Sequence, residues 1–299
     1  MTTTTTTTTT SSTSPAPPAV NDSGLVAVIP AVAADRVEEA SRPLRQAQGM
    51  PLRSVPGPAY IRLGDALGWR GLFAERTAFE RAFADLLLNT PQRNGRVLDI
   101  GCGDDLPGAL TCLRGQIGPL DGVDPDPAIV RHPLLEQRWQ SPLEASGVPD
   151  DTYSLAYAYN VVEHLADPRP FLSRVYALLR PGGVFLALAP NAVHPFAVLS
   201  RAIEVVGLKA LARRSIGLAE TGEMRVNEYP AYYRCNSPPA VRRAICGLGF
   251  RAATFYFHPC VQWDNYFPRV LRWAPRLYDF VLGSRVTPLM QVFMFRLEK

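Results

Sequence analysis

The sequence lacks the cysteine pattern of a zinc-binding or disulfide-stabilised protein. Its five cysteines include no Cys-x-x-Cys pair, and their number is odd. Neither a structural metal nor a disulfide framework is therefore expected, and a reducing compartment, the cytoplasm, is the predicted location. Long apolar runs are also missing, because the best one, residues 184–199, is interrupted by two prolines, Asn191 and His194. We therefore expect no membrane-spanning helix.

The N-terminus also lacks the basic start and the apolar core of a secretory signal. Residues 1–58 are instead of low complexity, with nine consecutive threonines followed by Ser, Pro and Ala. Such a segment buries too little apolar surface to offset its loss of conformational entropy, so we expect it to be disordered. Residues 59–94 have apolar residues at three- and four-residue spacing, which predicts a helical cap beginning near Tyr60.

Net charge is small but unevenly distributed. The formal net charge is +4 for 299 residues. From Pro195 onward there are 15 basic and 7 acidic residues, whereas the residues before it hold 16 and 20. A basic C-terminal third fits an anionic substrate or surface, and it equally fits a solvated arginine-rich face; both interpretations stay open.

A nucleoside-binding pattern begins at residue 97. Residues 97–100 are a short apolar run with one acid, Asp99, which is typical of a buried parallel strand. Gly101, Cys102 and Gly103 follow, and the glycines allow a ligand to approach the backbone closely. An apolar-periodic segment over residues 106–113 then predicts a helix. Asp124 ends the next predicted strand, where a carboxylate can accept hydrogen bonds from both hydroxyls of a ribose.

The glycine pattern is not that of a dinucleotide-binding protein. Leu106 stands where the third glycine of Gly-x-Gly-x-x-Gly would be. Asp104 and Asp105, at the start of the predicted helix, would repel a pyrophosphate. A cationic nucleoside without phosphates suits these acids better, and a nucleotide-dependent oxidoreductase is disfavoured.

Several motifs resemble those of the class I S-adenosylmethionine-dependent methyltransferases of the small-molecule type. They are VLDIGCG, GVDPD, PDDTYSL, NVVEHLADP and LLRPGG, and together they cover residues 96–191. The resemblance implies an α/β, doubly wound, Rossmann-like domain over residues 95–299 with helices on both faces. Its seven-stranded sheet would have the order 3-2-1-4-5-7-6, with helical insertions at about 196–236 and 261–285.

The same resemblance implies S-adenosylmethionine as cofactor, with S-adenosylhomocysteine as product. In the family, the loop after the third strand contacts the adenine ring. Its usual Gly-Asp-Ala is missing here, so the adenine-binding residues are only weakly indicated by the sequence. The residues matching the family's cofactor-binding positions are Asp99, Gly101, Cys102, Gly103, Asp124, Pro125, Leu143, Glu144 and Asn160.

Two histidines are candidates for catalysis. His194 follows the fifth predicted strand, where acceptor-binding residues gather in the family, and His164 belongs to the Glu-His-Leu signature. Either could serve as a general base for a hydroxyl acceptor, while His132 and His258 are expected to be structural. The candidate acceptor contacts come from a Tyr-rich segment, for which ordinary packing is the alternative: Tyr229, Tyr232, Tyr233 and Arg234.

Residues 261–282 form a predicted basic amphipathic helix. Apolar residues, including Val270, Leu277 and Tyr278, would occupy one face, with Asp279 among arginines on the other. Such a helix can lie in a membrane interface, here the inner face of the membrane. The alternative is that its apolar face covers the pocket or a dimer partner.

The predicted activity is therefore methyl transfer to a small-molecule acceptor. A hydroxyl oxygen of a natural product, quinone, sugar or lipid-linked compound is preferred over carbon or nitrogen. A nucleic-acid or protein methyltransferase and a non-catalytic cofactor-binding domain are the alternatives. Because Asn160-Val161-Val162 stands where amino-group nucleic-acid enzymes have [DNS]PP[YF], no nucleic-acid partner is expected.

Overall fold

A computed structural model describes residues 60–62, 78–205, 229–259, 267, 269–283 and 286–299. These residues all belong to one compact unit, Ala40–Lys299. The predicted disordered tail, residues 1–58, lies outside the described residues. So do parts of the predicted cap and of both insertions, among them 63–77, 206–228 and 260–266.

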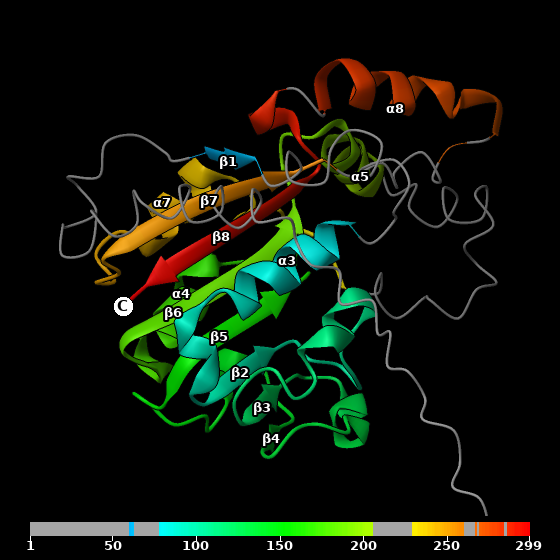
Figure 1. Ribbon diagram of the computed structural model, residues 1–299. Coiled ribbons are helices and arrows are strands. Elements are labelled where there is room, and N and C mark those ends of the chain that lie inside the picture. The colour runs from blue at the N-terminus through cyan, green and yellow to red at the C-terminus, as the bar shows by residue number, and fades with distance from the viewer. Residues whose placement is uncertain (1–59, 63–77, 206–228, 260–266, 268, 284–285) are drawn as a thin grey trace, which may run out of the picture. The chain divides into compact units, whose positions relative to one another are not determined.

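A mixed sheet of eight strands forms the centre of this unit (Figure 1). Its order is β1-β7-β8-β6-β5-β2-β3-β4, and all neighbouring pairs are parallel except those that β8 makes with β6 and β7. The strands are β1 (Tyr60–Arg62), β2 (Val97–Ile100), β3 (Leu120–Val123), β4 (Arg138–Trp139), β5 (Tyr153–Tyr159), β6 (Leu179–Pro190), β7 (Ala252–His258) and β8 (Val292–Glu298).

The predicted strand order is confirmed by β2 to β8. Numbered from β2 and read from the β4 edge, these seven strands follow the order 3-2-1-4-5-7-6. β1 is an additional edge strand, and Tyr60 pairs with Phe255 of β7. The prediction of a helix beginning near Tyr60 is therefore wrong for residues 60–62. The partner of this strand lies nearly 200 residues away, and helical spacing cannot reveal such a distant pairing.

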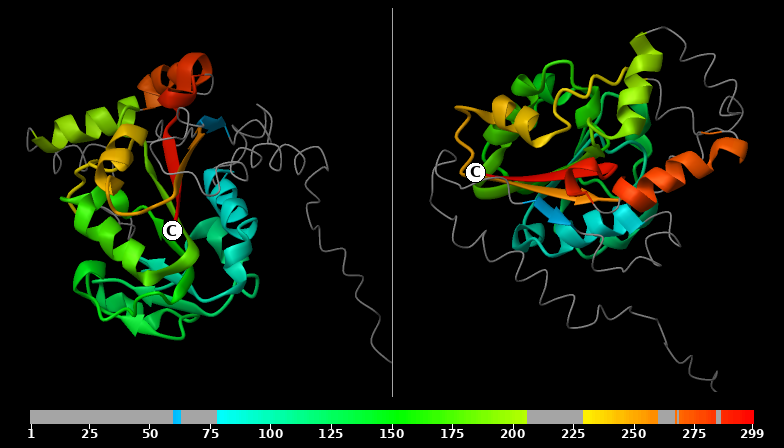
Figure 2. Two further views of the ribbon diagram at one scale, coloured as in Figure 1. Left: turned by 90° about the vertical axis from the view of Figure 1, so that its left-hand side faces the viewer. Right: turned by 90° about the horizontal axis from the view of Figure 1, so that it is seen from above.

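Helices cover both faces of the sheet (Figure 2). On one face α3 (Ala78–Leu88) packs Phe83 and Leu87 into a core with β2, β5 and β6 residues such as Leu186. On the other face α4 (Pro168–Leu178) and α7 (Pro238–Ile245) pack on the sheet, and Phe171 of α4 shares a core with Phe185 of β6. Successive strand residues alternate between the two cores, as a sheet buried on both faces requires.

Two predicted elements differ in detail from the structure. The segment after the glycine turn is a 3₁₀ helix, Gly108–Leu113, rather than an α-helix. Gly108 has a φ of 48°, and a Cβ there would clash with the Glu80 carboxylate of α3, which accepts the Ala109 N–H at 3.0 Å. The third predicted strand, near residues 138–142, is shortened to Arg138–Trp139.

The C-terminal insertion contains the largest difference. After a 3₁₀ turn, Arg269–Leu271, come α8 (Trp273–Tyr278) and a π turn, Asp279–Gly283. Asp279 is 3 % exposed, so at this residue the predicted polar face is turned toward the protein, and the predicted apolar face is turned outward. The reason is a distant partner, since Asp279 Oδ1 lies 3.8 Å from Nε2 of the buried His194 ring.

The strand order reverses at β2, the position called the topological switch point. β3 and β4 are added on one side of β2, whereas β5 and β6 are added on the other. In open α/β sheets ligands bind outside the carboxyl ends of the strands at this point. The glycine turn after β2 and Asn160 after β5 lie there, since Ile100 pairs with Ala158.

Candidate active site

The turn after β2 depends on its two glycines in different ways. Gly101 and Gly103 have φ values of 75° and 58°, the left-handed region that glycine adopts without strain. A Cβ at Gly101 would lie 2.3 Å from Val161 Cγ2, whereas a Cβ at Gly103 would meet no atom of the described residues within 4 Å. Gly101 therefore lets the β5 tip pack on the turn, and Gly103 exposes its backbone to open space.

The Asp124 carboxylate is fixed against this turn. Its Oδ2 accepts the Gly103 N–H at 2.8 Å, and its Oδ1 accepts the Asp126 N–H at 2.7 Å. Burial raises the pKa of Asp124, while these two hydrogen bonds oppose the rise. The sequence prediction thus placed Asp124 correctly beside the glycine turn, with the carboxylate held in a defined orientation.

Asp99 is buried in β2 and is held by a tyrosine that the sequence analysis missed. The Tyr157 hydroxyl donates to Asp99 Oδ2 at 2.7 Å, because these residues are paired across β2 and β5. Burial raises the pKa of Asp99 to about 7; the Tyr157 hydrogen bond lowers it and the Asp124 charge raises it. A carboxyl in this state would ionise readily beside a cation. Only the strand register could have identified Tyr157.

Cys102 contributes packing rather than a reactive thiol. Its side chain is 5 % exposed, and a Cβ at Gly122 would lie 2.7 Å from its Sγ. Burial raises the pKa of the Cys102 thiol, and the nearby Asp99 and Asp124 charges add to this rise. The thiol therefore stays protonated and unreactive at neutral pH.

The two acids after the turn are neutralised by arginines. Asp104 lies 3.0 Å from Arg131, and Asp105 lies 2.6 Å from Arg114. Because all four side chains are substantially exposed, these pairs stabilise the fold little. Their effect is to reduce the negative charge around the glycine turn.

The other predicted cofactor contacts lie beyond β3, β4 and β5. Pro125 and Glu144 are exposed, while Leu143 is buried in a 3₁₀ turn, Leu143–Ala145. Asn160 has a φ of 54°, and its backbone N–H donates to Leu188 O at 2.9 Å. Their contacts with a cofactor stay predictions.

The Glu-His-Leu turn after β5 packs against the Tyr-rich segment. The backbone N–H groups of Tyr232 and Tyr233 donate to Glu163 O at 2.7 and 3.0 Å. His164 Nδ1 lies 3.0 Å from Pro230 O, and Arg234 donates to Ala166 O at 2.7 Å. The structure thus brings together His164 and the predicted acceptor segment, which are far apart in sequence.

These acceptor candidates differ in exposure. Tyr229 and Tyr232 are 48 % and 37 % exposed, and Arg234 is exposed as well, whereas Tyr233 is 8 % exposed. Tyr229 lies beside His164, with 6.0 Å between the ring centroids. Tyr233 therefore serves packing in this structure, while the other three side chains are accessible.

Glu163 is a buried carboxyl beside His164. Its Oε1 lies 3.9 Å from His164 Nε2, and Oε2 has no hydrogen-bond partner among the described residues. Burial raises the pKa of Glu163 to about 8. The carboxyl is therefore largely protonated at neutral pH, and the sequence motif gave no sign of this.

His194 has a different environment from His164. It is 1 % exposed, its Nδ1 accepts the Phe196 N–H at 3.1 Å, and its Nε2 lies 3.8 Å from Asp279 Oδ1. Its ring also contacts Tyr278, with 5.2 Å between centroids. His194 thus joins the end of β6 to the C-terminal helical segment.

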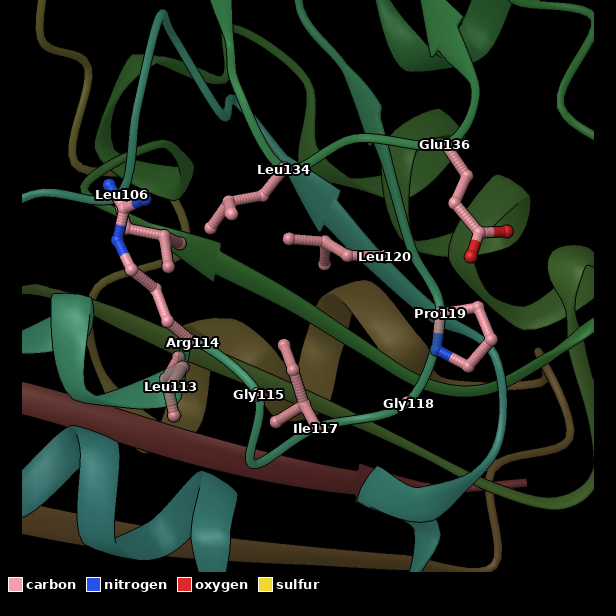
Figure 3. Close-up of a pocket in the computed structure, with 10 residues that line it drawn as sticks. All are labelled: Leu106, Leu113, Arg114, Gly115, Ile117, Gly118, Pro119, Leu120, Leu134 and Glu136. Carbon is pink, nitrogen blue, oxygen red and sulfur yellow. The ribbon is translucent and has the colours of Figure 1, made fainter. Parts of the chain in front are cut away.

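A pocket of about 350 Å³, lined by leucines together with Arg114 and Glu136, lies beyond the glycine turn (Figure 3). Leu106, Leu120 and Leu134 converge on it from the glycine-turn loop, from β3 and from the segment before β4. Neither Asp99 nor Asp124 lines it. The pocket therefore does not belong to the carboxylate site.

The raised pKa values of Asp99 and Glu163 should make the free energy of unfolding decrease as the pH rises from about 4 to about 8. Each carboxyl has a higher pKa in the folded chain than in the unfolded chain, so the folded chain retains a proton that the unfolded chain releases. The stabilisation is full below about pH 4, declines above it, and is lost above pH 7 for Asp99 and pH 8 for Glu163.

Glu163→Gln should flatten this dependence between pH 7 and 8 by on the order of 1 kcal/mol per pH unit. Urea denaturation over this pH range measures the effect, with Glu144→Gln as an exposed control. Equal slopes in the wild type and Glu163→Gln would contradict the assignment of Glu163 as a buried neutral acid.

Comparison with known proteins identifies the family. A family model described as a methyltransferase domain matches residues 73–235, more than half of the chain. A trans-aconitate 2-methyltransferase of Methylobacterium radiotolerans is 33% identical over 172 residues, which is 56% of this chain and 64% of that protein. The enzyme of the same name from Variovorax paradoxus is 28% identical over 230 residues, or 74% and 81%.

A ubiquinone biosynthesis O-methyltransferase of a Methylobacterium species is 32% identical over 110 residues, or 32% of this chain and 41% of that protein. The match to the M. radiotolerans enzyme spans less than two thirds of that enzyme's length. With the family model, the strand order and the carboxylates at the glycine turn in agreement, the chain belongs to the class I S-adenosylmethionine-dependent methyltransferase family.

Proposed function

We propose that the protein transfers a methyl group from S-adenosylmethionine to an oxygen of a small-molecule acceptor. The observation that carries the proposal is that Asp124 is bonded to the Gly103 N–H of the glycine turn, while Asp99 is buried in the strand that leads into this turn. A hydroxyl of a natural product, quinone, sugar or lipid-linked compound is the acceptor we favour. The relatives named for trans-aconitate and for ubiquinone O-methylation support a small acceptor.

The residues at the turn fit S-adenosylmethionine, a cationic nucleoside without phosphates. The Asp124 carboxylate is bonded to the turn, and the buried Asp99 lies close enough to interact with its charge. A Cβ at Gly103 would meet no described atom within 4 Å, which leaves room for a ligand. We assign the ribose hydroxyls to Asp124 and the positively charged methionine end to Asp99. When bound, S-adenosylmethionine supplies an electrophilic methyl group on a sulfonium, and alignment with the acceptor provides most of the rate enhancement.

A hydroxyl acceptor must lose its proton, and the tautomers of the two candidate histidines favour His164 for this role. A carbonyl oxygen can only accept, so the contact with Pro230 O assigns the proton of neutral His164 to Nδ1. Nε2 is then the nitrogen that can take a proton. Ionisation of the neighbouring Glu163 carboxyl would stabilise the resulting imidazolium.

His194 is less suited to the same role. Because its Nδ1 accepts the Phe196 N–H, neutral His194 has its proton on Nε2, directed at Asp279. Its burial also removes the ring from contact with a diffusing acceptor. We therefore propose His164 as the general base and His194 as a structural contact.

The test is transfer of an isotopically labelled methyl group from S-adenosylmethionine to panels of hydroquinones, other phenols, sugars and hydroxy acids, with trans-aconitate included. Mass spectrometry locates the label. We expect label on oxygen in one acceptor class, and none with Asp124→Ala. Label found only on carbon or nitrogen, or only in added RNA or protein, would contradict the proposal.

A further inference from the structure

The C-terminal helical segment presents its apolar side chains to solvent. Val270 is 79 % exposed, Trp273 is 64 % exposed and Phe280 is 54 % exposed. Contiguous apolar surface of this kind is uncommon on soluble monomers and marks interaction sites. The α8 surface, as we name it, consists of Val270, Leu271, Trp273, Leu277, Phe280, Val281 and Leu282, each at least 40 % exposed.

Polar contacts hold this segment to the protein in that orientation. Asp279 is buried and faces His194 at 3.8 Å, and the Tyr278 hydroxyl donates to Leu289 O at 3.1 Å. Asp279 is thus turned inward, whereas the apolar side chains and Arg276 face outward. A helix that only had to cover the core of a soluble protein would have the opposite orientation.

A second helix adds to this surface. α5 (Pro195–Val205) begins directly after His194, whose ring contacts Tyr278. Val198 and Leu199 of α5 are 54 % and 45 % exposed. α5 and α8 lie at the same end of the sheet in both views (Figures 1 and 2). Exposed apolar side chains are therefore present on both helices at this end of the sheet.

Among the described residues of α5 and the α8 segment, the exposed charges are positive. Arg276 is exposed and Arg272 is half-buried, while the acid within Val270–Leu282, Asp279, is buried. Arg201 of α5 is exposed as well. Two copies of this surface facing each other would bring these arginines together without opposing exposed acids from Val270–Leu282. An anionic lipid surface instead matches both the apolar side chains and the arginines.

We propose that the α8 surface docks on anionic lipid membranes as an interfacial element. Trp273 and Phe280 would insert at the level of the lipid headgroups, and Arg276 would face the lipid phosphates. No helix in the described part of the chain is long and apolar enough to cross a bilayer, so the attachment is peripheral. This proposal can be tested separately from the proposed methyl transfer, because lipid binding can be measured without S-adenosylmethionine or acceptor.

Co-sedimentation of the full chain with lipid vesicles tests this proposal. We expect binding to vesicles of phosphatidylcholine with phosphatidylglycerol, and much weaker binding to phosphatidylcholine alone. The double variant Val270→Glu/Trp273→Glu should bind anionic vesicles at least tenfold more weakly. Val130→Glu is the matched control, because Val130 is 66 % exposed and lies on the 3₁₀ turn Pro127–Arg131, outside the α8 surface. Circular dichroism verifies that each variant is folded.

Wild-type protein that stays in solution with both vesicle types would overturn the proposal. Equal binding by the double variant and by Val130→Glu would also overturn it. If light scattering showed a stable dimer that the double variant dissociates, without vesicle binding by the wild type, a second copy of the chain would be the occupant of the surface.

Discussion

Asp124→Ala should weaken the binding of S-adenosylhomocysteine by roughly 100-fold or more. A carboxylate that accepts two ribose hydroxyls makes charge-assisted hydrogen bonds, each worth about 1.5–3 kcal/mol. The substitution also removes the acceptor of the Gly103 N–H and so loosens the glycine turn. Isothermal titration calorimetry measures the affinity directly.

Glu136→Ala is the control for this experiment. Glu136 is an exposed acid that precedes β4 and pairs with Arg96, away from the glycine turn. We expect its affinity to stay within twofold of wild type, and thermal melts verify the folding of both variants. An Asp124→Ala protein that is folded and binds as tightly as the wild type would show that Asp124 does not contact the ligand.

His164→Gln should lower kcat by about 10²–10⁴-fold on a hydroxyl acceptor. The variant removes the proposed general base but leaves Asp99 and Asp124 in place, so the affinity for S-adenosylhomocysteine should change little. Steady-state kinetics with the labelled acceptor measure kcat, and calorimetry measures the affinity. An acceptor that ionises by itself at high pH should reduce the difference between variant and wild type.

His194→Gln provides the comparison. Because His194 is buried between β6 and the C-terminal segment, we expect a lower melting temperature, with a loss of about 1–3 kcal/mol of stability. Its kcat below the melting temperature should stay closer to wild type than that of His164→Gln. The reverse order of the two kcat values would assign the general base to His194.

Much of the fold could be predicted from the sequence because its signals are local. VLDIGCG joins an apolar strand to a glycine turn, and LLRPGG joins a helix to a strand. Connections of this kind determine a doubly wound sheet when they recur at regular intervals. The placement of Asp124 beside Gly103 follows from the same rule, since both end neighbouring strands.

The features that the sequence did not reveal depend on distant residues. Tyr157 meets Asp99 only through the register of β2 and β5, and Tyr60 pairs with a strand nearly 200 residues away. The burial of Glu163 could not be predicted from its motif, because the Tyr-rich segment that packs on its turn is about 70 residues away in the sequence. Asp279 faces inward because of its partner His194, which no periodicity indicates.

Titration of S-adenosylmethionine into the wild-type protein tests the central claim, that Asp99 and Asp124 form a site for a cationic nucleoside. At about pH 6.5, in two buffers with different ionisation enthalpies, we expect micromolar binding with release of somewhat less than one proton. The proton comes from Asp99, whose pKa of about 7 falls beside the cation, and Asp99→Asn should abolish the release. Absence of binding to the folded wild-type protein would contradict the account.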